Sequence, residues 1–201
     1  NCVKNLESNR QIINLINPKD IFGDPIESYN EDAFFINFNC QYKDKSCVIK
    51  FKMKADNWSI DKDDKKLTLN DLKTTSSDVS EFMGINFFKF NYYTQFYIYL
   101  YILSEYCKQQ YNFDDTWTTD CNVIVVGTRG NNETAVYKVF NVLLEEGERE
   151  FYRLLKMVAF KAGDTVKVYV KIKEGNKEFC RLLKMVAYCE MYGYDDDYMF
   201  M

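Results

Sequence analysis

The 201-residue sequence contains no histidine, and its seven cysteines include no Cys-x-x-Cys pair. Zinc sites are built mainly from these two residue types, so no zinc site is expected. The cysteines are odd in number and scattered along the chain: Cys2, Cys40, Cys47, Cys107, Cys121, Cys180 and Cys189. This pattern favours reduced intracellular thiols over a disulfide framework.

Long apolar runs are also missing. No segment approaches the roughly 18 apolar residues that a membrane-spanning helix needs. The first residues, Asn1 to Lys4, lead into a polar amphipathic stretch and not into a signal peptide. We therefore expect a cytoplasmic protein that does not associate with a membrane.

The chain has no excess of positive charge. It carries 26 Lys and Arg against 30 Asp and Glu, a formal net charge of -4, which argues against binding nucleic acid through overall charge. A nuclease is not excluded, because carboxylates that hold a divalent metal attract phosphate locally. Aromatic residues are abundant at 17%. Two alternative explanations of this abundance stay open. One is an AT-rich coding sequence, and the other is a half-exposed surface on which the bases of single-stranded nucleic acid stack.

Hydrophobic periodicity predicts an α/β fold. Apolar spacing predicts helices over 6–16 and 88–110, and the first of these ends at Asn17-Pro18. Short turns join three predicted strands into an antiparallel meander, and two further strands follow the second helix: 33–39, 46–55, 67–72, 121–127 and 135–140. The expected architecture is a mixed central sheet flanked by helices, with the core order αβββαβ.

The C-terminal third contains a near-duplication. Residues 150–160 (EFYRLLKMVAF) recur at 178–188 (EFCRLLKMVAY), and each copy predicts a surface helix with apolar residues on one face and Arg and Lys on another. The alternating stretch 165–173 between them predicts a strand. Either a recent duplication or an irregularity in the reported sequence would explain so close a match. We divide the chain into a core over 1–145 and a C-terminal α/β extension over 146–201, and we expect no solenoid because only two copies occur.

Three charged residues are the candidates for catalysis. Asp56 is predicted to end the second strand, and Asp71 and Lys73 lie near the end of the third. Side chains alternate along a strand, so Asp71 and Lys73 point to the same face. Two carboxylates can hold Mg²⁺, which stabilises charge on a phosphate and lowers the pKa of a bound water. The lysine can orient or deprotonate that water, with a pKa lowered by burial and by the metal. Solvated strand ends are the alternative interpretation.

These residues resemble a known signature. Lys54-Ala55-Asp56 followed by Asp71-Leu72-Lys73-Thr74-Thr75 resembles the motif of the PD-(D/E)XK nuclease superfamily, which is restriction-endonuclease-like in fold. The RecB-like and lambda-exonuclease-like branch also carries a Gln-x-x-x-Tyr motif on the following helix, where Gln95 and Tyr99 stand here. Residues four apart share a helical face. Routine packing in a Tyr-rich helix is the alternative for this pair. The resemblance covers about 5–127, and Ala55 replaces the usual proline of the motif.

The resemblance implies roles for individual residues. Asp56, Asp71 and the main-chain carbonyl of Leu72 would hold Mg²⁺ or Mn²⁺, and Glu7 on the first helix is nominated as a further ligand, with Glu27 and Glu31 as rivals. Catalysis would use Asp56, Asp71, Lys73, Gln95 and Tyr99. Nucleic acid would contact Thr74, Thr75, Gln95, Tyr99 and Lys54. Lys50, Lys52 and Lys54 either bind phosphate or form the wet face of a sheet. The iron–sulfur cluster of some relatives is not expected, since Cys180 and Cys189 do not supply its cysteines.

The expected function is a metal-dependent deoxyribonuclease, an exonuclease or DNA-processing enzyme. The chain also resembles small nucleases of this class encoded by bacteriophages, which implies a role in phage replication, recombination or packaging in the host cytoplasm. A homo-oligomer or a phage partner protein would accompany that role. RNA as substrate stays open. The alternative is a catalytically silent nuclease-fold protein that acts as a nucleic-acid-binding or assembly module.

Overall fold

The computed structural model describes residues 2–42, 45–129, 133–162 and 167–171. Its elements follow in the order α1 (Cys2–Ser8), α2 (Arg10–Ile16), β1 (Glu27–Tyr42), β2 (Lys45–Asp61), β3 (Lys66–Thr75), η1 (Val79–Glu81), η2 (Phe82–Asn86), α3 (Phe87–Lys89), α4 (Tyr92–Tyr111), β4 (Thr118–Gly127), β5 (Thr134–Lys138), α5 (Asn141–Ala162) and β6 (Lys167–Lys171).

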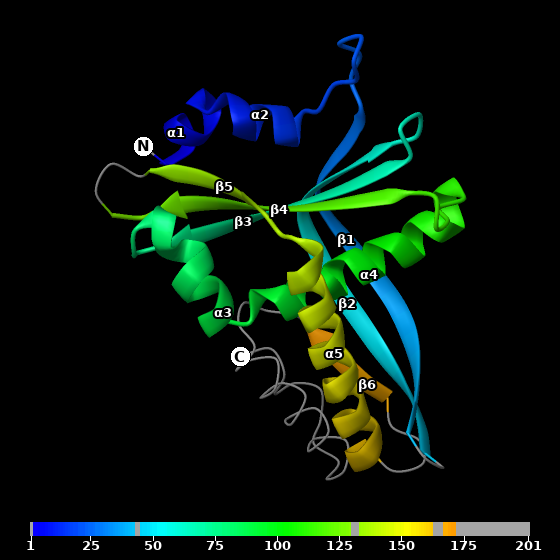
Figure 1. Ribbon diagram of the computed structural model, residues 1–201. Helices are drawn as coiled ribbons and strands as arrows, with labels where there is room; N and C mark the ends of the chain where they lie inside the picture. The colour runs from blue at the N-terminus through cyan, green and yellow to red at the C-terminus, as the bar shows by residue number, and fades with distance from the viewer. Residues whose placement is uncertain (1, 43–44, 130–132, 163–166, 172–201) are drawn as a thin grey trace.

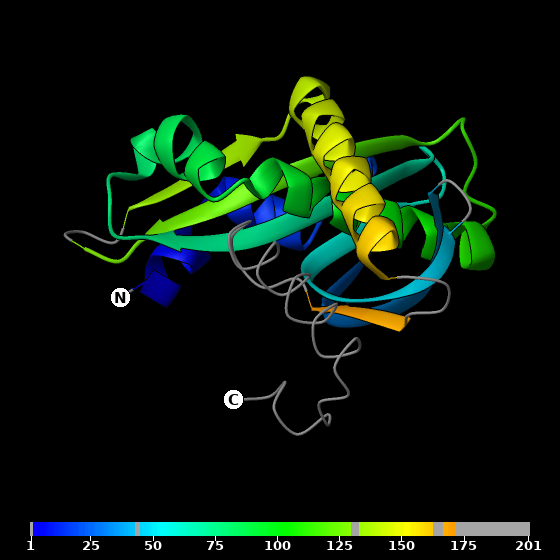
Figure 2. The ribbon, with the colours of Figure 1, turned by 90° about the horizontal axis from the view of Figure 1, so that it is seen from below.

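The strands form one sheet in the order β1-β2-β3-β4-β5, with β6 beside β2. β1, β2 and β3 are antiparallel neighbours, whereas β4 runs parallel to β3 and β5 antiparallel to β4. Helices α1 and α2 cover one face, and α3, α4 and α5 cover the other (Figures 1 and 2). The predicted α/β class, mixed sheet and αβββαβ order are confirmed.

The N-terminal helix differs from its prediction. The single helix expected over 6–16 is two helices, α1 and α2, separated at Asn9. Asn9 is extended (φ -85°, ψ 104°), and its side chain accepts hydrogen bonds from the backbone N–H groups of Gln11 and Ile12. Asparagine favours this capping role over a helix interior, so apolar periodicity alone misses the break.

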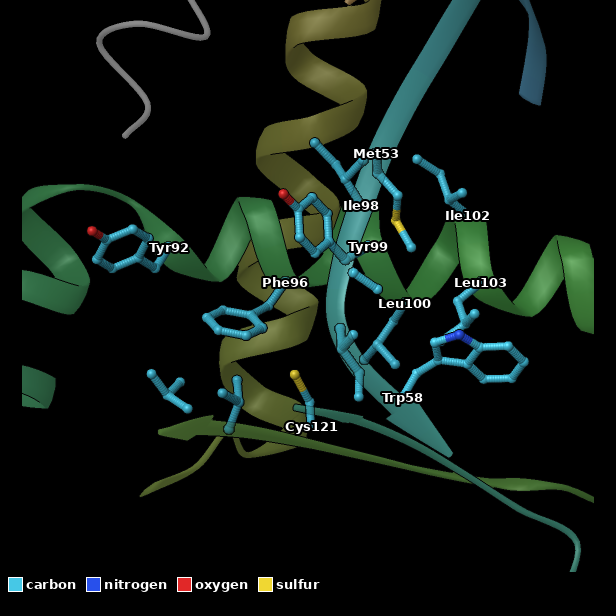
Figure 3. Close-up of a cluster of buried hydrophobic side chains, with 14 of the residues drawn as sticks. Met53, Trp58, Tyr92, Phe96, Ile98, Tyr99, Leu100, Ile102, Leu103 and Cys121 are labelled. Atoms are coloured by element: carbon cyan, nitrogen blue, oxygen red, sulfur yellow. The ribbon is translucent and has the colours of Figure 1, made fainter. Parts of the chain in front are cut away.

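The core lies between the sheet and α4, and α5 packs across α4. Buried side chains from β2, α4 and β4 meet there, among them Met53, Trp58, Phe96, Leu103 and Cys121 (Figure 3). Phe151 of α5 completes an aromatic cluster with Phe38, Phe51, Tyr97 and Tyr101. Much of the aromatic content therefore goes into core packing. No helix within the described ranges is long and apolar enough to span a membrane.

Helix α5 crosses the predicted boundary between residues 145 and 146. It begins at Asn141 and buries Phe151, Leu154 and Leu155 in the core that the earlier elements form. The first copy of the near-duplicated segment, 150–160, is helical as predicted, and the strand expected over 165–173 is β6. The second copy, 178–188, lies outside the described residues. The division into two domains stays a prediction.

Close packing of α5 on α4 depends on Gly147. A Cβ built on this residue would lie 2.3 Å from the carbonyl oxygen of Tyr93 and 2.9 Å from the Cβ of Tyr97. The first contact is with backbone, so α5 would have to move away from α4. We predict that Gly147→Ala destabilises the protein by about 1–3 kcal/mol through overpacking, despite its better helix propensity.

Thermal unfolding measures this effect. About 2–4 °C of Tm is expected for each kcal/mol in a chain of this size. Gly84→Ala is the matched control, because a Cβ there meets nothing within 4 Å. Equal melting temperatures for the two variants would contradict the close crossing.

Asp120 joins three strands through two ion pairs. Its carboxylate lies 2.8 Å from Lys66 Nζ on β3 and 2.5 Å from Lys138 Nζ on β5. Partial burial raises the pKa of Asp120, but hydrogen bonds from Lys138 and Lys66 outweigh it and the pKa falls below its ordinary value. A lowered folded-state pKa stabilises the protein above the unfolded-state pKa, near 4, and this stabilisation is lost as the pH falls further.

We therefore predict that Asp120→Asn lowers stability by less than about 1 kcal/mol at pH 7, as is usual for partly exposed pairs. The difference from wild type should disappear on acidification below about pH 3. Urea titrations at several pH values measure it, with the exposed Asp63→Asn as control. A difference that does not depend on pH would exclude the ion pairs as its cause.

Candidate active site

The hairpin of β2 and β3 opens where the two aspartates stand. The two strands pair from Asp61 and Lys66 to Asn57 and Asn70, and the next residues in this register are Asp56 and Asp71. Beyond Asn57, β2 bends away with β1, while β3 continues along β4 as far as Thr75 (Figure 1). We call this place the fork. It sets Asp56 and Asp71 opposite each other on separating strands.

Asp56 lies at a kink in β2, and the prediction that it ends the strand is wrong. β2 continues to Asp61, because this stretch pairs with both β1 and β3. The β1–β2 ladder omits the pair of Glu31 and Asp56, and Glu31 has a left-handed φ of 59°. The alternation of core-facing side chains along β2 shifts by one residue at the kink. Met53 and Ala55, at odd positions, face the core before it, and Trp58, at an even position, faces the core after it. Asp56 is thus released from regular pairing with β1.

A hydrogen bond fixes the carboxylate of Asp56 across the fork. Its Oδ2 accepts from the backbone N–H of Leu72 at 2.7 Å. Leu72 stands between Asp71 and Lys73, so Asp56 is attached to the stretch of β3 that carries the other two candidates. Its second oxygen, Oδ1, accepts no hydrogen bond from the described residues. Because β2 and β3 separate here, the Asp56 carboxylate reaches the backbone of β3 between Asp71 and Lys73, the other two predicted catalytic residues.

Asp71 and Lys73 form a buried ion pair. Lys73 Nζ lies 2.6 Å from Asp71 Oδ2, and each side chain is only 4% exposed. Lys73 Nζ also lies 5.0 Å from the centre of the Tyr92 ring. Burial lowers the pKa of Lys73, but the charge and hydrogen bond of Asp71 outweigh it and raise the pKa above its ordinary value. Burial thus acts in the predicted direction, and the lowering of the pKa by burial together with a metal stays a prediction. Lys73 is a charged ammonium.

Gln95 and Tyr99 lie on the face of α4 that covers the fork, and both are buried. Burial and the nearby charge of Asp71 raise the pKa of Tyr99 to about 12, while a hydrogen bond from Gln95 opposes the rise. The charge of Lys73 also lowers the pKa of this hydroxyl, and the charge of Asp56 raises it. Within the described part of the chain, Gln95 Oε1 is buried without a hydrogen-bond partner. The helix motif therefore stands beside the strand motif, as the sequence predicts.

Tyr92 is a site residue that the sequence analysis missed. Its ring covers the ammonium of Lys73 and stacks on Phe82 at 5.7 Å (Figure 3 places Tyr92 and Tyr99 on α4). Tyr92 precedes Tyr99 by seven residues, a spacing that puts both on one helical face. The seven-residue spacing was therefore the feature of the sequence that could have placed Tyr92 at the site.

The two threonines after Lys73 differ in environment. Thr74 is exposed, whereas Thr75 is buried. Thr75 Oγ1 accepts hydrogen bonds from Asn86 Nδ2 at 2.9 Å and from the backbone of Ser77 at 3.1 Å. Thr75 therefore anchors the loop that follows β3, and Thr74 is the one that solvent reaches.

Of the predicted lysines, Lys54 forms an ion pair with Glu31, and Lys52 lies 5.2 Å from the centre of the Phe35 ring. Both are exposed. Glu7 lies exposed on α1, and α1 covers the face of the sheet opposite to α4 (Figures 1 and 2). Glu27 pairs with Lys62. Over the described ranges, none of these carboxylates completes a metal-binding group of three with the two aspartates.

The donors at the fork suit a metal that needs few protein ligands. Over the described ranges, no three or more Cys, Asp or Glu side chains gather closely enough to hold a metal. Two carboxylates and the main chain of Leu72 remain. Mg²⁺ is commonly bound by one or two carboxylates, substrate phosphate and several waters, whereas Ca²⁺ takes six to eight oxygens. The donor set at the fork therefore fits Mg²⁺.

No protein-family model matches the chain, and no curated protein matches it. One similar solved structure is the crystal structure of a protein from Eubacterium rectale that is provisionally named an exonuclease. The two are 10% identical with a TM-score of 0.43, and the match covers 92% of this chain and 57% of the other. The chain thus spans little more than half the length of that protein. A likeness of this size does not establish a shared activity.

Proposed function

We propose that the chain is a metal-dependent nuclease that hydrolyses phosphodiester bonds in DNA, as a member of the RecB-like and lambda-exonuclease-like branch of the PD-(D/E)XK superfamily. One observation carries the proposal. Asp56 and Asp71 directly adjoin the last paired residues of β2 and β3, Lys73 forms an ion pair with Asp71, and Asp56 accepts a hydrogen bond from the backbone N–H of Leu72.

In this proposal Asp56, Asp71 and the carbonyl of Leu72 hold Mg²⁺ or Mn²⁺. A metal bound there would supply charge stabilisation for the scissile phosphate and would lower the pKa of a bound water. Lys73, as a charged ammonium, donates hydrogen bonds to the attacking water or to a phosphate oxygen and stabilises the charge that develops there. Asp71 and the Tyr92 ring fix the position of its Nζ atom.

Residues around this centre bind the strand. The buried Gln95 amide and Tyr99 hydroxyl are available to contact a phosphate or sugar that enters the fork, and such contacts position a nucleic acid without reading its sequence. Asp56 is half-buried, and the Leu72 side chain is 41% exposed. In this proposal a substrate enters beside Asp56, because the Leu72 side chain points to the other face of β3 from Asp71 and Lys73. Thr74 and Lys54 are proposed as further contacts.

The burial of the ion pair favours a second candidate function. Asp71 and Lys73 are each 3% exposed, so the pair is closed to a bulky phosphodiester in this conformation. A catalytically silent protein that binds nucleic acid or supports assembly would retain such a pair for stability alone. The role in phage replication, recombination or packaging, with an oligomer or partner protein in the host cytoplasm, is part of the first proposal and depends on the sequence resemblance.

A cleavage assay separates the two candidates. The protein is incubated with end-labelled linear DNA, closed circular DNA and RNA, with Mg²⁺ or Mn²⁺ and with EDTA, beside Lys73→Ala and the exposed Lys156→Ala. The nuclease proposal expects metal-dependent cutting that only Lys73→Ala loses, and resistance of circles marks an exonuclease. Cutting that persists in EDTA contradicts the metal, and no cutting of any substrate favours the silent module.

A further inference from the structure

Four asparagines form a chain of side-chain hydrogen bonds across the strands that meet at the fork. Asn57 Nδ2 donates to Asn30 Oδ1 at 2.9 Å, Asn70 Nδ2 to Asn57 Oδ1 at 2.7 Å, and Asn122 Nδ2 to Asn70 Oδ1 at 2.9 Å. They come from β1, β2, β3 and β4 in spatial order. We call this set the asparagine chain. It spans the sheet at the level where β2 and β3 part.

Two members of the asparagine chain also hold helix α2. Asn70 Nδ2 donates to the carbonyl of Leu15 at 3.0 Å, and Asn57 Nδ2 lies 3.4 Å from the carbonyl of Ile16. The last carbonyls of a helix have no partner within it. Asn70 supplies a partner for the carbonyl of Leu15, and Ser28 Oγ donates with Asn57 to that of Ile16. Asn57 and Asn70 are therefore enclosed between the sheet and α2, on the face opposite to α4.

The same two residues adjoin the candidate metal ligands. Asn57 and Asn70 are the last paired residues before the fork, and Asp56 and Asp71 are their immediate neighbours. Neighbouring side chains on β3 point to opposite faces, so a rotation of β3 at Asn70 would move the carboxylate of Asp71. Asn57 is 4% exposed and Asn70 1%, so neither amide can exchange its partner for bulk water. Breaking such a buried hydrogen bond is costly, which fixes the geometry.

We propose that Asn57 and Asn70 are positioning residues that fix the point where β2 and β3 separate, and so hold Asp56 and Asp71 at the spacing needed to share one divalent metal. This inference rests on the proposed function. It assigns the two asparagines to the metal site although they lie on the opposite face of the sheet.

Binding of Mn²⁺ alone tests this role without any need for cleavage. Isothermal titration of the full chain, well below the melting temperature of each variant, gives the Kd for Asn70→Ala, Asn57→Ala and Asn122→Ala. Asn122 is the matched control, because it is buried and does not adjoin an aspartate. Its replacement removes one hydrogen bond of Asn70 but leaves those that Asn70 donates to Asn57 and Leu15. We expect Kd to rise about 10-fold or more for Asn70→Ala and Asn57→Ala, in the range usual for residues that orient metal ligands. Asn122→Ala should change it less than about 2-fold.

A purely structural role would lower the melting temperature of all three variants without changing the Mn²⁺ affinity of the folded protein, and that result overturns the inference. Asp71→Asn distinguishes its failure from that of the proposed function. If Asp71→Asn loses Mn²⁺ and the two asparagine variants do not, only the positioning role fails. If wild type binds no Mn²⁺, both fail. Should Asn70→Ala not fold, Asn57→Ser, whose hydroxyl can still donate one hydrogen bond, carries the same comparison.

Discussion

Replacing Asp71 with asparagine is expected to reduce metal-dependent cleavage by about 1000-fold or more. The amide has the size of the carboxylate, and its oxygen can still accept a hydrogen bond from Lys73 Nζ, which lies 2.6 Å from Asp71 Oδ2. It lacks the negative charge that a hard divalent cation requires. A metal that acts as a Lewis acid contributes several kcal/mol to the transition state, and each 1.36 kcal/mol corresponds to a factor of about ten in rate.

Single-turnover cleavage of end-labelled DNA measures this loss, with circular dichroism to show that the variant is folded. Asp63→Asn, at an exposed position in the turn between β2 and β3, is the control and should cut like wild type. A rate for Asp71→Asn within tenfold of wild type would show that Asp71 is not a metal ligand. Cutting by neither wild type nor variant would instead support the silent module.

Lys73→Met is expected to give the largest loss of stability. It leaves the Asp71 carboxylate in a site where both side chains are 4% exposed, without the opposite charge that compensates its burial. Breaking a buried ion pair on one side typically costs about 3–5 kcal/mol, whereas replacing both partners with neutral groups is often tolerated. The double variant Asp71→Asn/Lys73→Met should therefore be more stable than Lys73→Met alone.

Urea unfolding of wild type, both single variants and the double variant forms a cycle that isolates the coupling between the two residues. Strongly non-additive losses are expected, since each residue compensates the burial of the other. Additive losses would mean that the pair is accessible to water. The unfolding curves also show whether Asp71→Asn and Lys73→Met remain folded, which separates lost folding from lost chemistry in these variants.

Local periodicity predicted the parts of the site that lie within one element. Alternation along β3 placed Asp71 and Lys73 on one face, and the four-residue spacing on α4 placed Gln95 beside Tyr99. Both features follow from the geometry of a single strand or helix. The predicted αβββαβ order likewise depended on local patterns and short turns, and it is confirmed.

Features that depend on the register between distant strands could not be predicted. The fork exists because β3 pairs with β4 beyond the point where β2 leaves it, and no pattern within either strand reveals this. Strands β1 and β2 extend well past their apolar cores because pairing with each other stabilises their polar ends. The sequence pattern indicates that Lys73 is buried, which lowers its pKa, but it does not reveal the hydrogen bond to Asp71, which raises that pKa.

The asparagine chain shows the same limit. Asn57, Asn70 and Asn122 look like ordinary polar residues in the sequence, and only the alignment of three strands makes them partners. Their position beside Asp56 and Asp71 becomes meaningful once the fork is known. Polar residues buried in a sheet next to candidate ligands are therefore worth testing together with the ligands themselves.

Anomalous diffraction from crystals containing Mn²⁺ tests the central claim most directly. We predict one anomalous peak at the fork, about 2.0–2.3 Å from an oxygen of both Asp56 and Asp71, as expected for a small octahedral cation. Crystals of Asp71→Asn should lack this peak. Carboxylates that lie more than about 5 Å apart, or a fork without bound metal at saturating Mn²⁺, would contradict the claim that this site is a metal-dependent nuclease centre.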